Sequence, residues 1–99
     1  MAEGSLRVVA RMVAKAESMG EVREILSGLV GPTRGEAGCV SYELLQNRAD
    51  PTDFTFVEEW EGDAALDAHL ASAHIQNARS RLPGLLAAEP DIRRYSVVE

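Results

Sequence analysis

The segment from residue 54 to residue 75 changes its hydrophobic period part-way along, and no other feature of the sequence constrains the fold as much. Residues 54–61 alternate between two faces, with the period of two that is typical of a β-strand. Gly62 and Asp63 break this alternation, and the Asp63 carboxylate is suited to accept hydrogen bonds from the free amides of a helix N-terminus. An apolar stripe at helical spacing then follows. The segment therefore predicts a strand that leads directly into a helix.

Both halves of this segment carry polar side chains among apolar neighbours. Glu58 shares a strand face with Trp60 and two phenylalanines, and His69 lies at the edge of the apolar stripe of the helix. If the helix packs on that strand face, a carboxylate, an indole N–H and an imidazole converge on one apolar cavity. The sequence therefore points to Glu58, Trp60 and His69 as the centre of a candidate site.

The rest of the chain completes an order of strand, helix, strand, strand, helix, strand. Residues 6–14 alternate as a strand with one fully apolar face. Residues 18–30 have helical periodicity behind a capping box formed by Ser18 and Glu21, and Gly31-Pro32 is predicted to end this helix. The other predicted elements are strands at residues 39–47 and 92–98, and a short helix that begins after Ser72 and stops at Pro83-Gly84.

This order of elements fits an α+β fold. We expect one domain over residues 1–99, with residues 1–5 as a disordered lead, and a ferredoxin-like βαββαβ path that builds a four-stranded antiparallel sheet. Two helices cover one face of that sheet, and no predicted element is left to cover the other. Because an uncovered apolar sheet face is an association surface, we expect a homodimer that buries sheet against sheet.

Composition excludes several classes of partner. The chain has 16 acidic and 10 basic residues, a net charge of −6 and no basic run, which argues against binding to nucleic acid or to anionic membranes. No apolar run approaches the length of about 18 residues that a membrane span needs, and the first fourteen residues lack a signal-peptide pattern. Cys39 is the only cysteine, so no internal disulfide is possible, and it is interpreted as a small core residue. We therefore expect a cytoplasmic protein.

Three blocks of the sequence resemble the antibiotic biosynthesis monooxygenase family, whose members are small dimeric α+β barrel proteins. The blocks are PTRGEAGCVSYEL at residues 32–44, FVEEW at residues 56–60, and ALDAHLASAHI at residues 65–75. The third block is similar to the family pattern A-L-x-x-H-x-x-S-x-H-F, with Ala73 where proline is common and Ile75 where an aromatic is common. The resemblance implies the dimeric barrel fold, but it leaves the substrate open. Relatives include quinol and anthrone monooxygenases without metal or flavin, heme-degrading proteins, an isomerase-type enzyme and proteins of unknown role.

The oxygenases among these relatives meet a definite chemical demand. Triplet oxygen reacts poorly with closed-shell organic molecules but can take an electron from an electron-rich aryloxide or carbanion. A protein that uses no cofactor must therefore remove a substrate proton, stabilise the resulting anion and exclude bulk water. A neutral imidazole can act as the base, an indole N–H or a guanidinium can stabilise oxyanion charge, and aromatic walls suit a flat polycyclic substrate.

On this basis each of the three central residues has a predicted role. His69 is the predicted base or proton shuttle, Glu58 orients its ring, and Trp60 donates to the developing oxyanion. Each residue also has a structural alternative. His69 could bond to Glu58 or to the backbone as an ordinary helix histidine. Glu58 could form an ion pair with Arg11 or Arg93, and Trp60 could serve only as core aromatic mass.

Five further side chains are predicted to contact the substrate. Tyr42 and Phe56 are candidates for the cavity wall, His74 for the cavity mouth, and Arg11 and Arg79 for pairing with an anionic group of the substrate. The structural alternatives are core packing for the two aromatic residues, helix capping or solvent exposure for the histidine, and solvated charge for the two arginines.

No metal or other cofactor is predicted. His69 and His74 are five residues apart, which places them about 140° apart around a continuous helix. The favoured function is therefore a cofactor-independent monooxygenase that uses molecular oxygen to oxidise a quinol, an anthrone or a related hydroxylated aromatic. Two alternatives stay open: a non-enzymatic dimeric protein that binds a small molecule or is associated with stress, and a cofactor-free isomerase that uses the same histidine.

Overall fold

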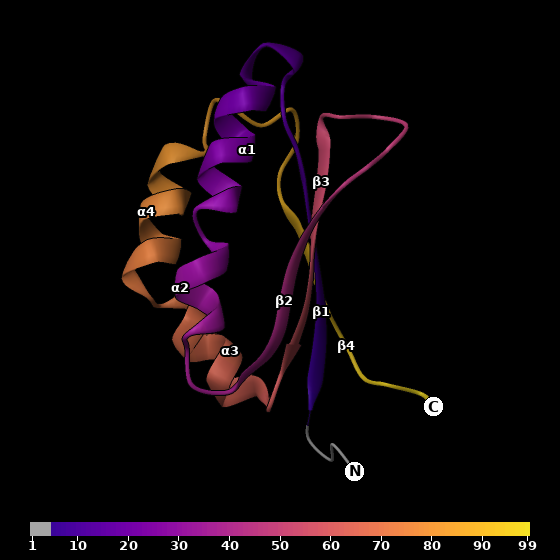
Figure 1. Ribbon diagram of the computed structural model, residues 1–99, viewed down its shortest axis with the longest axis vertical. Helices are drawn as coiled ribbons and strands as arrows, with labels where there is room; N and C mark the ends of the chain where they lie inside the picture. The colour runs from indigo at the N-terminus through magenta and orange to yellow at the C-terminus, as the bar shows by residue number, and fades with distance from the viewer. Residues whose placement is uncertain (1–4) are drawn as a thin grey trace.

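The computed structural model describes residues 5–99, which form a four-stranded antiparallel sheet with a layer of helices on one face (Figure 1). In chain order the elements are β1 (Leu6–Val13), η1 (Ala16–Ser18), α1 (Met19–Ser27), α2 (Val30–Arg34), β2 (Cys39–Gln46), β3 (Asp53–Trp60), α3 (Asp63–Leu70), α4 (Ala73–Arg81) and β4 (Asp91–Tyr95). The strand order across the sheet is β2-β3-β1-β4. This architecture confirms the predicted α+β, ferredoxin-like fold. The disordered lead predicted for residues 1–5 lies almost wholly outside the described residues.

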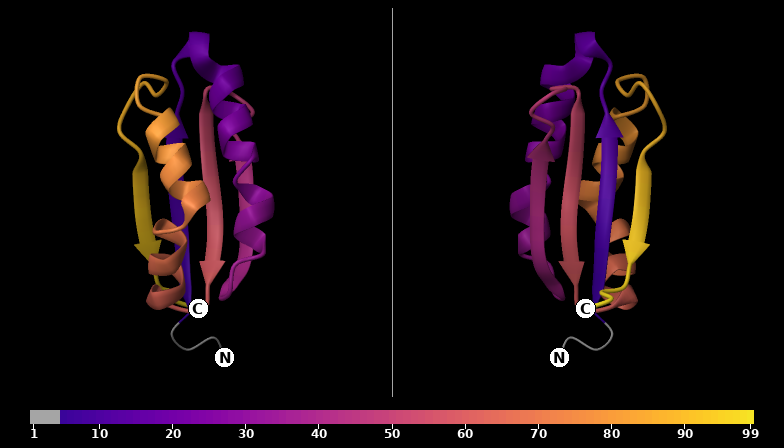
Figure 2. Two further views of the ribbon diagram at one scale, coloured as in Figure 1. Left: turned by 90° about the vertical axis from the view of Figure 1, so that its left-hand side faces the viewer. Right: turned by 90° about the vertical axis from the view of Figure 1, so that its right-hand side faces the viewer.

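Side-chain alternation along the strands separates the two faces of the sheet. On β1, Leu6, Val8 and Ala10 are buried under the helices, whereas the residues between them are more exposed. Ala10 lies between Phe56 of β3 and Ile92 of β4 in the register, so these residues belong to the same face. Figure 2 shows the helices over this face, and no element of the described residues over the other.

The first helical region differs from its prediction. Helix α1 ends at Ser27, and α2 then contains Gly31-Pro32, the dipeptide that was wrongly predicted to end a helix. Pro32 is tolerated because it lies in the first turn of α2, where the backbone N–H has no intrahelical partner to lose. The predicted capping box is also wrong, since the Ser18 side chain makes no capping hydrogen bond. Over residues 5–99 no helix combines the length and the apolar character that crossing a membrane requires.

The second helical region begins at Asp63 and is interrupted at Ser72. Asp63 is the first residue of α3 rather than its cap, and its Oδ1 accepts a hydrogen bond of 2.8 Å from Arg94 of β4. Ser72 has extended backbone dihedrals, and its hydroxyl donates to the carbonyl oxygen of His69 at 2.6 Å. The chain therefore changes direction between α3, which carries His69, and α4, which carries His74. This change of direction lets the two histidine side chains reach the same region.

The approach of β2 to α3 depends on a glycine, and this leads to a first prediction. Gly38 has a φ of +83°, and a Cβ at this position would lie 2.5 Å from the Cβ of Ala65. Gly84 has a similar φ of +88° but nothing within 4 Å of the corresponding position. We expect Gly38→Ala to lower the free energy of unfolding by about 2–5 kcal/mol, because it combines overpacking with left-handed backbone strain. Gly84→Ala bears only the strain, about 1–2 kcal/mol.

Urea unfolding of the two glycine variants at equal protein concentration measures this difference. The two variants share the backbone cost, so the gap between them reports the close contact of Gly38 with α3. Equal losses of stability would show that the chain relieves the contact by a shift that costs little.

Candidate functional site

A cavity of about 490 Å³ lies between the sheet and the helices. Its walls come from β1, β2, β3, α3, α4 and the segment that precedes β4, and most of the lining side chains are apolar. Its polar lining residues are Tyr42, Glu58, His69, Arg79 and Glu89. An apolar cavity of this size with a few polar groups is typical of a site for a small organic molecule.

His69 lines this cavity and forms a hydrogen bond with a carboxylate that lies outside it. The side chain is 3% exposed, and its Nδ1 donates to Glu36, with distances of 3.0 Å to Oε1 and 3.2 Å to Oε2. Burial lowers the pKa of His69 below its ordinary value, and the attraction of Glu36 opposes this shift only in part. A neutral imidazole with its proton on Nδ1 carries its lone pair on Nε2. Glu36 therefore selects the tautomer in which Nε2 can accept a proton.

His74 joins the same carboxylate from the next helix. Its Nε2 contacts Glu36 Oε2 and lies 3.3 Å from Thr33 Oγ1, and the His69 and His74 rings are 6.0 Å apart between centroids. The prediction from helical spacing kept the two histidines apart because it assumed one continuous helix, and the interruption at Ser72 removes that assumption. His74 does not line the large cavity as predicted but lines a smaller surface pocket between α1 and α4.

Glu36, His69 and His74 together could hold a metal ion. One ligand atom of each residue lies within 4.8 Å of the others. Two imidazoles and a carboxylate are donors that Zn²⁺ and several other divalent metals accept. In the structure the same atoms satisfy one another as hydrogen-bond partners, with Glu36 accepting from both rings.

Glu58 occupies a different place in the site from the one expected. It is 4% exposed, and its Oε1 accepts a hydrogen bond of 2.8 Å from Trp60 Nε1. Burial raises the pKa of Glu58 to about 7, the hydrogen bond from Trp60 opposes this, and the charge of Glu36 adds to it. The expectation that Glu58 orients His69 is therefore corrected, because the carboxylate at His69 Nδ1 is that of Glu36.

The structural alternative predicted for Glu58, an ion pair with Arg11 or Arg93, is also wrong. Arg11 pairs with Asp53, at 2.9 Å between Nε and Oδ1, and Arg93 pairs with Asp91 at the same distance. In the strand register both arginines fall on the sheet face opposite the helices. Arg11 is therefore not among the cavity residues as predicted, whereas Arg79 of α4 is.

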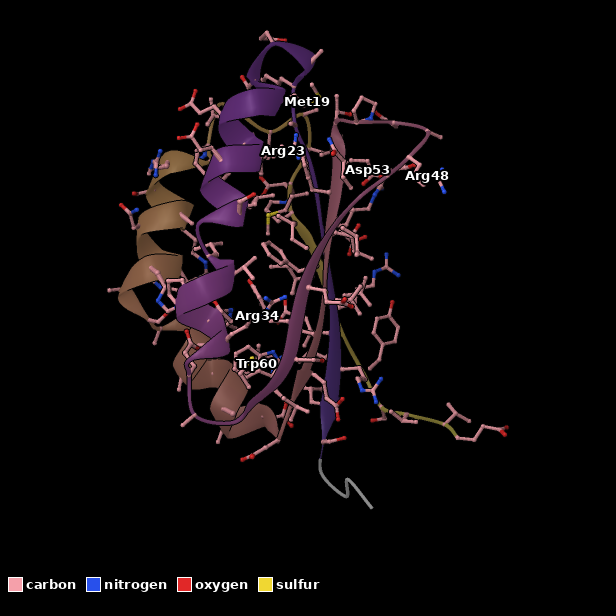
Figure 3. The ribbon with its side chains drawn as sticks, in the orientation of Figure 1. Met19, Arg23, Arg34, Arg48, Asp53 and Trp60 are labelled. Atoms are coloured by element: carbon pink, nitrogen blue, oxygen red, sulfur yellow. The ribbon has the colours of Figure 1, made fainter. Side chains whose placement is uncertain are left out.

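Two aromatic side chains pack against the His69 ring, and a third stacks on one of them. The Trp60 ring lies 4.7 Å and the Tyr42 ring 5.6 Å from it between centroids, and Tyr42 stacks on Phe56 at 4.8 Å. Tyr42 and Phe56 line the cavity, whereas Trp60 is fully buried behind it, between the helices and the sheet (Figure 3). Burial raises the pKa of Tyr42 well above its ordinary value, so its hydroxyl stays protonated.

Glu36 is the residue of the candidate site that the sequence analysis did not identify. It lies in the loop between α2 and β2, 33 residues before His69. Periodicity carries no information about a loop side chain, and a contact of this separation depends on how α3 packs beside that loop. The one available signal was the block at residues 32–44, which contains Glu36 and carries part of the family resemblance.

The burial of Glu58 predicts how stability depends on pH. Its folded-state pKa of about 7 exceeds the ordinary 4.5, so the folded protein keeps a proton that the unfolded chain releases. This group therefore makes the free energy of unfolding fall as pH rises from about 4.5 to about 7, by about 3 kcal/mol at 1.36 kcal/mol per pKa unit. Glu58→Gln should remove that fall.

The measurement is urea unfolding of wild type and Glu58→Gln across this pH range. Their difference isolates Glu58 from His69, whose lowered pKa acts in the opposite sense and costs stability as pH falls below about 6.5. A difference that does not change with pH would show that Glu58 ionises as freely as it does in water.

Comparison with known proteins identifies the family. A family model described as "Antibiotic biosynthesis monooxygenase" matches residues 5–81, a span that contains the His69, Glu36 and Glu58 positions and all three sequence blocks. The chain belongs to this family. The resemblance noted in the sequence is thereby confirmed.

Two relatives of this family member carry provisional monooxygenase names. Rv0793 of Mycobacterium tuberculosis is 34% identical over 79 residues, which span 80% of this chain and 77% of Rv0793. YcnE of Bacillus subtilis is 29% identical over 85 residues, which span 86% of this chain and 90% of YcnE. Both names describe a monooxygenase, and neither specifies a substrate.

Solved structures match the whole fold. The structure of Rv0793 superposes with a TM-score of 0.91 at 26% identity and covers 96% of both chains. PA3566 of Pseudomonas aeruginosa superposes with a TM-score of 0.93 at 29% identity, covering 100% of this chain and 99% of its own. The agreement extends over the strands and helices that hold the candidate site.

Proposed function

We propose that this family member is a cofactor-independent monooxygenase that oxidises a quinol, an anthrone or a related hydroxylated aromatic with molecular oxygen. The observation that carries the proposal is the bond from His69 Nδ1 to Glu36, at 3.0 Å, on a ring that lines an apolar cavity. A base beside an apolar cavity meets the first requirement of this chemistry, which is removal of a proton from the substrate.

The first step is removal of a proton from the bound substrate. His69 Nε2 accepts the proton, and the imidazolium that forms is stabilised by Glu36, as a carboxylate stabilises histidine in a catalytic triad. The lowered pKa of His69 keeps the ring neutral, and therefore ready to accept a proton, at neutral pH. Glu36 thus takes the orienting role first expected of Glu58.

The second requirement is an environment in which the substrate anion forms and meets oxygen. Tyr42 and Phe56 supply flat walls for an aromatic ring system, and Arg79 brings a positive charge to the cavity. The electron-rich anion then passes an electron to oxygen without metal or flavin, and the substrate radical and superoxide combine to a peroxide that takes up the proton held by His69. Cleavage of the O–O bond with loss of water leaves one oxygen atom on the substrate. Trp60 contributes indirectly, because its N–H is already donated to Glu58.

Oxygen uptake tests the proposal. Purified protein with a metal chelator is given a panel of quinols and anthrones, and uptake above the rate of autoxidation is expected for at least one compound. The product mass must increase by oxygen. A product of unchanged mass would replace the oxygenase with an isomerase, and recovery of a tightly bound compound unchanged would favour a binding protein.

We also propose that two copies associate through the uncovered sheet face. The register places Leu45, Val57 and Tyr95 on this face, and each is between 38% and 48% exposed. Apolar side chains on a face that no described helix covers favour sheet-on-sheet pairing between copies.

Light scattering on a sizing column tests this association. We expect the wild type to have the mass of a dimer and Val57→Glu to shift toward the monomer, because a charge is then buried without a partner. Ala68→Glu, on the exposed side of α3, makes the same change of charge away from the sheet and should remain dimeric. A monomeric wild type would contradict the proposal.

A further inference from the structure

Glu58 is a buried carboxyl group without a cationic partner among the described residues. It is 4% exposed and lines the cavity, while Arg11 and Arg93 pair with aspartates elsewhere. The charge of an isolated buried carboxylate is costly, and such groups keep their proton instead. The site therefore contains a carboxylic acid group that the proton transfer to His69 does not use.

Trp60 determines which oxygen of Glu58 is available. Its indole N–H donates to Oε1 at 2.8 Å, so Oε1 acts as an acceptor and the acid proton belongs on Oε2. Among the described residues, no side-chain oxygen that is sealed from solvent lacks a hydrogen-bond partner. This agrees with an Oε2 that is reached from the cavity, which Glu58 lines.

The groups around Glu58 favour its neutral form. Tyr42 lies opposite it on β2, and Cys39 and Glu36 are the other titratable groups on that side. From the helices, His69 lines the cavity with its pKa lowered by burial, and Arg79 lines the cavity but makes no hydrogen bond or ion pair with Glu58. On β1 the residue opposite Glu58 is Val8, which is apolar. The nearby negative charge of Glu36 opposes ionisation, and burial opposes it more strongly.

We propose that Glu58 binds the substrate as a neutral carboxylic acid, donating a hydrogen bond from Oε2 to a ketone oxygen of an aromatic substrate while His69 Nε2 faces its acidic proton. This inference rests on the proposed function and narrows its substrate class to aromatic ketones and their enols. Such a donor stabilises charge on the substrate oxygen as the proton leaves for His69. It supplies the oxyanion contact that was first expected of Trp60, which becomes a positioning residue.

Binding of 9-fluorenone tests the inference, with fluorene as the matched control. Both compounds are flat, neutral and free of titratable groups, and only fluorenone has an oxygen that can accept a hydrogen bond. Affinity is measured by quenching of Trp60 fluorescence between about pH 6 and about pH 8.5. We expect wild type to bind fluorenone about tenfold more weakly at the upper end, because Glu58 loses its proton as pH passes about 7. Fluorene affinity should not change.

Variants assign the pH dependence to Glu58. Glu58→Gln keeps an N–H donor that does not titrate, so its fluorenone affinity should be constant over this pH range. His69→Asn should retain the wild-type pH dependence. Fluorene binding by each variant shows that its cavity is intact. Persistence of the tenfold fall in Glu58→Gln, or a pH-independent affinity in wild type, would overturn the inference.

The same measurements separate this inference from the proposed function. Selective, pH-dependent binding of the ketone without oxygen uptake on any substrate would reject the oxygenase and leave the role of Glu58 intact. Oxygen uptake together with equal affinities for fluorenone and fluorene would reject the role of Glu58 and leave the oxygenase intact. If neither compound binds at any pH, the cavity does not accept this class of ligand and the inference fails.

Discussion

Replacing His69 by alanine is expected to lower the rate of oxygen uptake on a verified substrate by about 10²–10⁴-fold, the usual contribution of a positioned base. The reason is that His69 combines a neutral ring, a cavity position and a carboxylate partner at Nδ1. No other described residue that lines the cavity combines these properties. The measurement is initial oxygen uptake under saturating substrate, with the fold verified by circular dichroism.

Two further variants separate the base from its support. His69→Asn places an amide N–H near the position of Nδ1, so it can still donate to Glu36 but cannot accept the substrate proton. It should be as inactive as His69→Ala. Glu36→Gln leaves the base in place but weakens the preference for the reactive tautomer and the stabilisation of the imidazolium. Its activity should lie between that of the wild type and that of His69→Ala. Full turnover by His69→Asn would remove His69 from the mechanism.

Replacing Trp60 by alanine is expected to lower the free energy of unfolding by about 3–5 kcal/mol, which is typical for the loss of a fully buried tryptophan. Trp60 is fully buried at the end of β3 and packs against the rings of Tyr42 and His69. Its loss leaves a cavity and removes the hydrogen bond to the buried Glu58. This loss is a large share of the 5–15 kcal/mol by which most domains are stable. Urea unfolding at fixed protein concentration measures it.

Trp60→Phe divides this effect into its two causes. Phenylalanine retains most of the buried aromatic volume but has no N–H, so the variant reports mainly the hydrogen bond to Glu58, about 1–3 kcal/mol for an acceptor left unpaired. Trp60→Ala should therefore be clearly less stable than Trp60→Phe. If the two variants were equally stable, the packing of the indole against the His69 ring would contribute little.

The sequence predicted the order of the elements because local periodicity determines it. Alternation along residues 6–14 and 54–61 was enough to identify two adjacent strands of the sheet, which the structure places as β1 and β3. Ser18 and Asp63 do not cap their helices as predicted, since a side chain that is suited to cap a helix does so only if the chain enters the helix at the right angle. Gly31-Pro32 does not end the helical region as predicted, because proline is compatible with the first turn of a new helix.

The sequence by itself determined the fold family and brought His69 and Glu58 to attention, because hydrophobic spacing and unusual polar residues are visible along the chain. Only the tertiary structure decided which carboxylate forms a hydrogen bond with which partner. Glu36 reaches His69 across 33 residues of sequence, and Glu58 binds Trp60 on its own strand. The physical reason is that a hydrogen bond requires two atoms within about 3 Å, and packing between layers decides that distance.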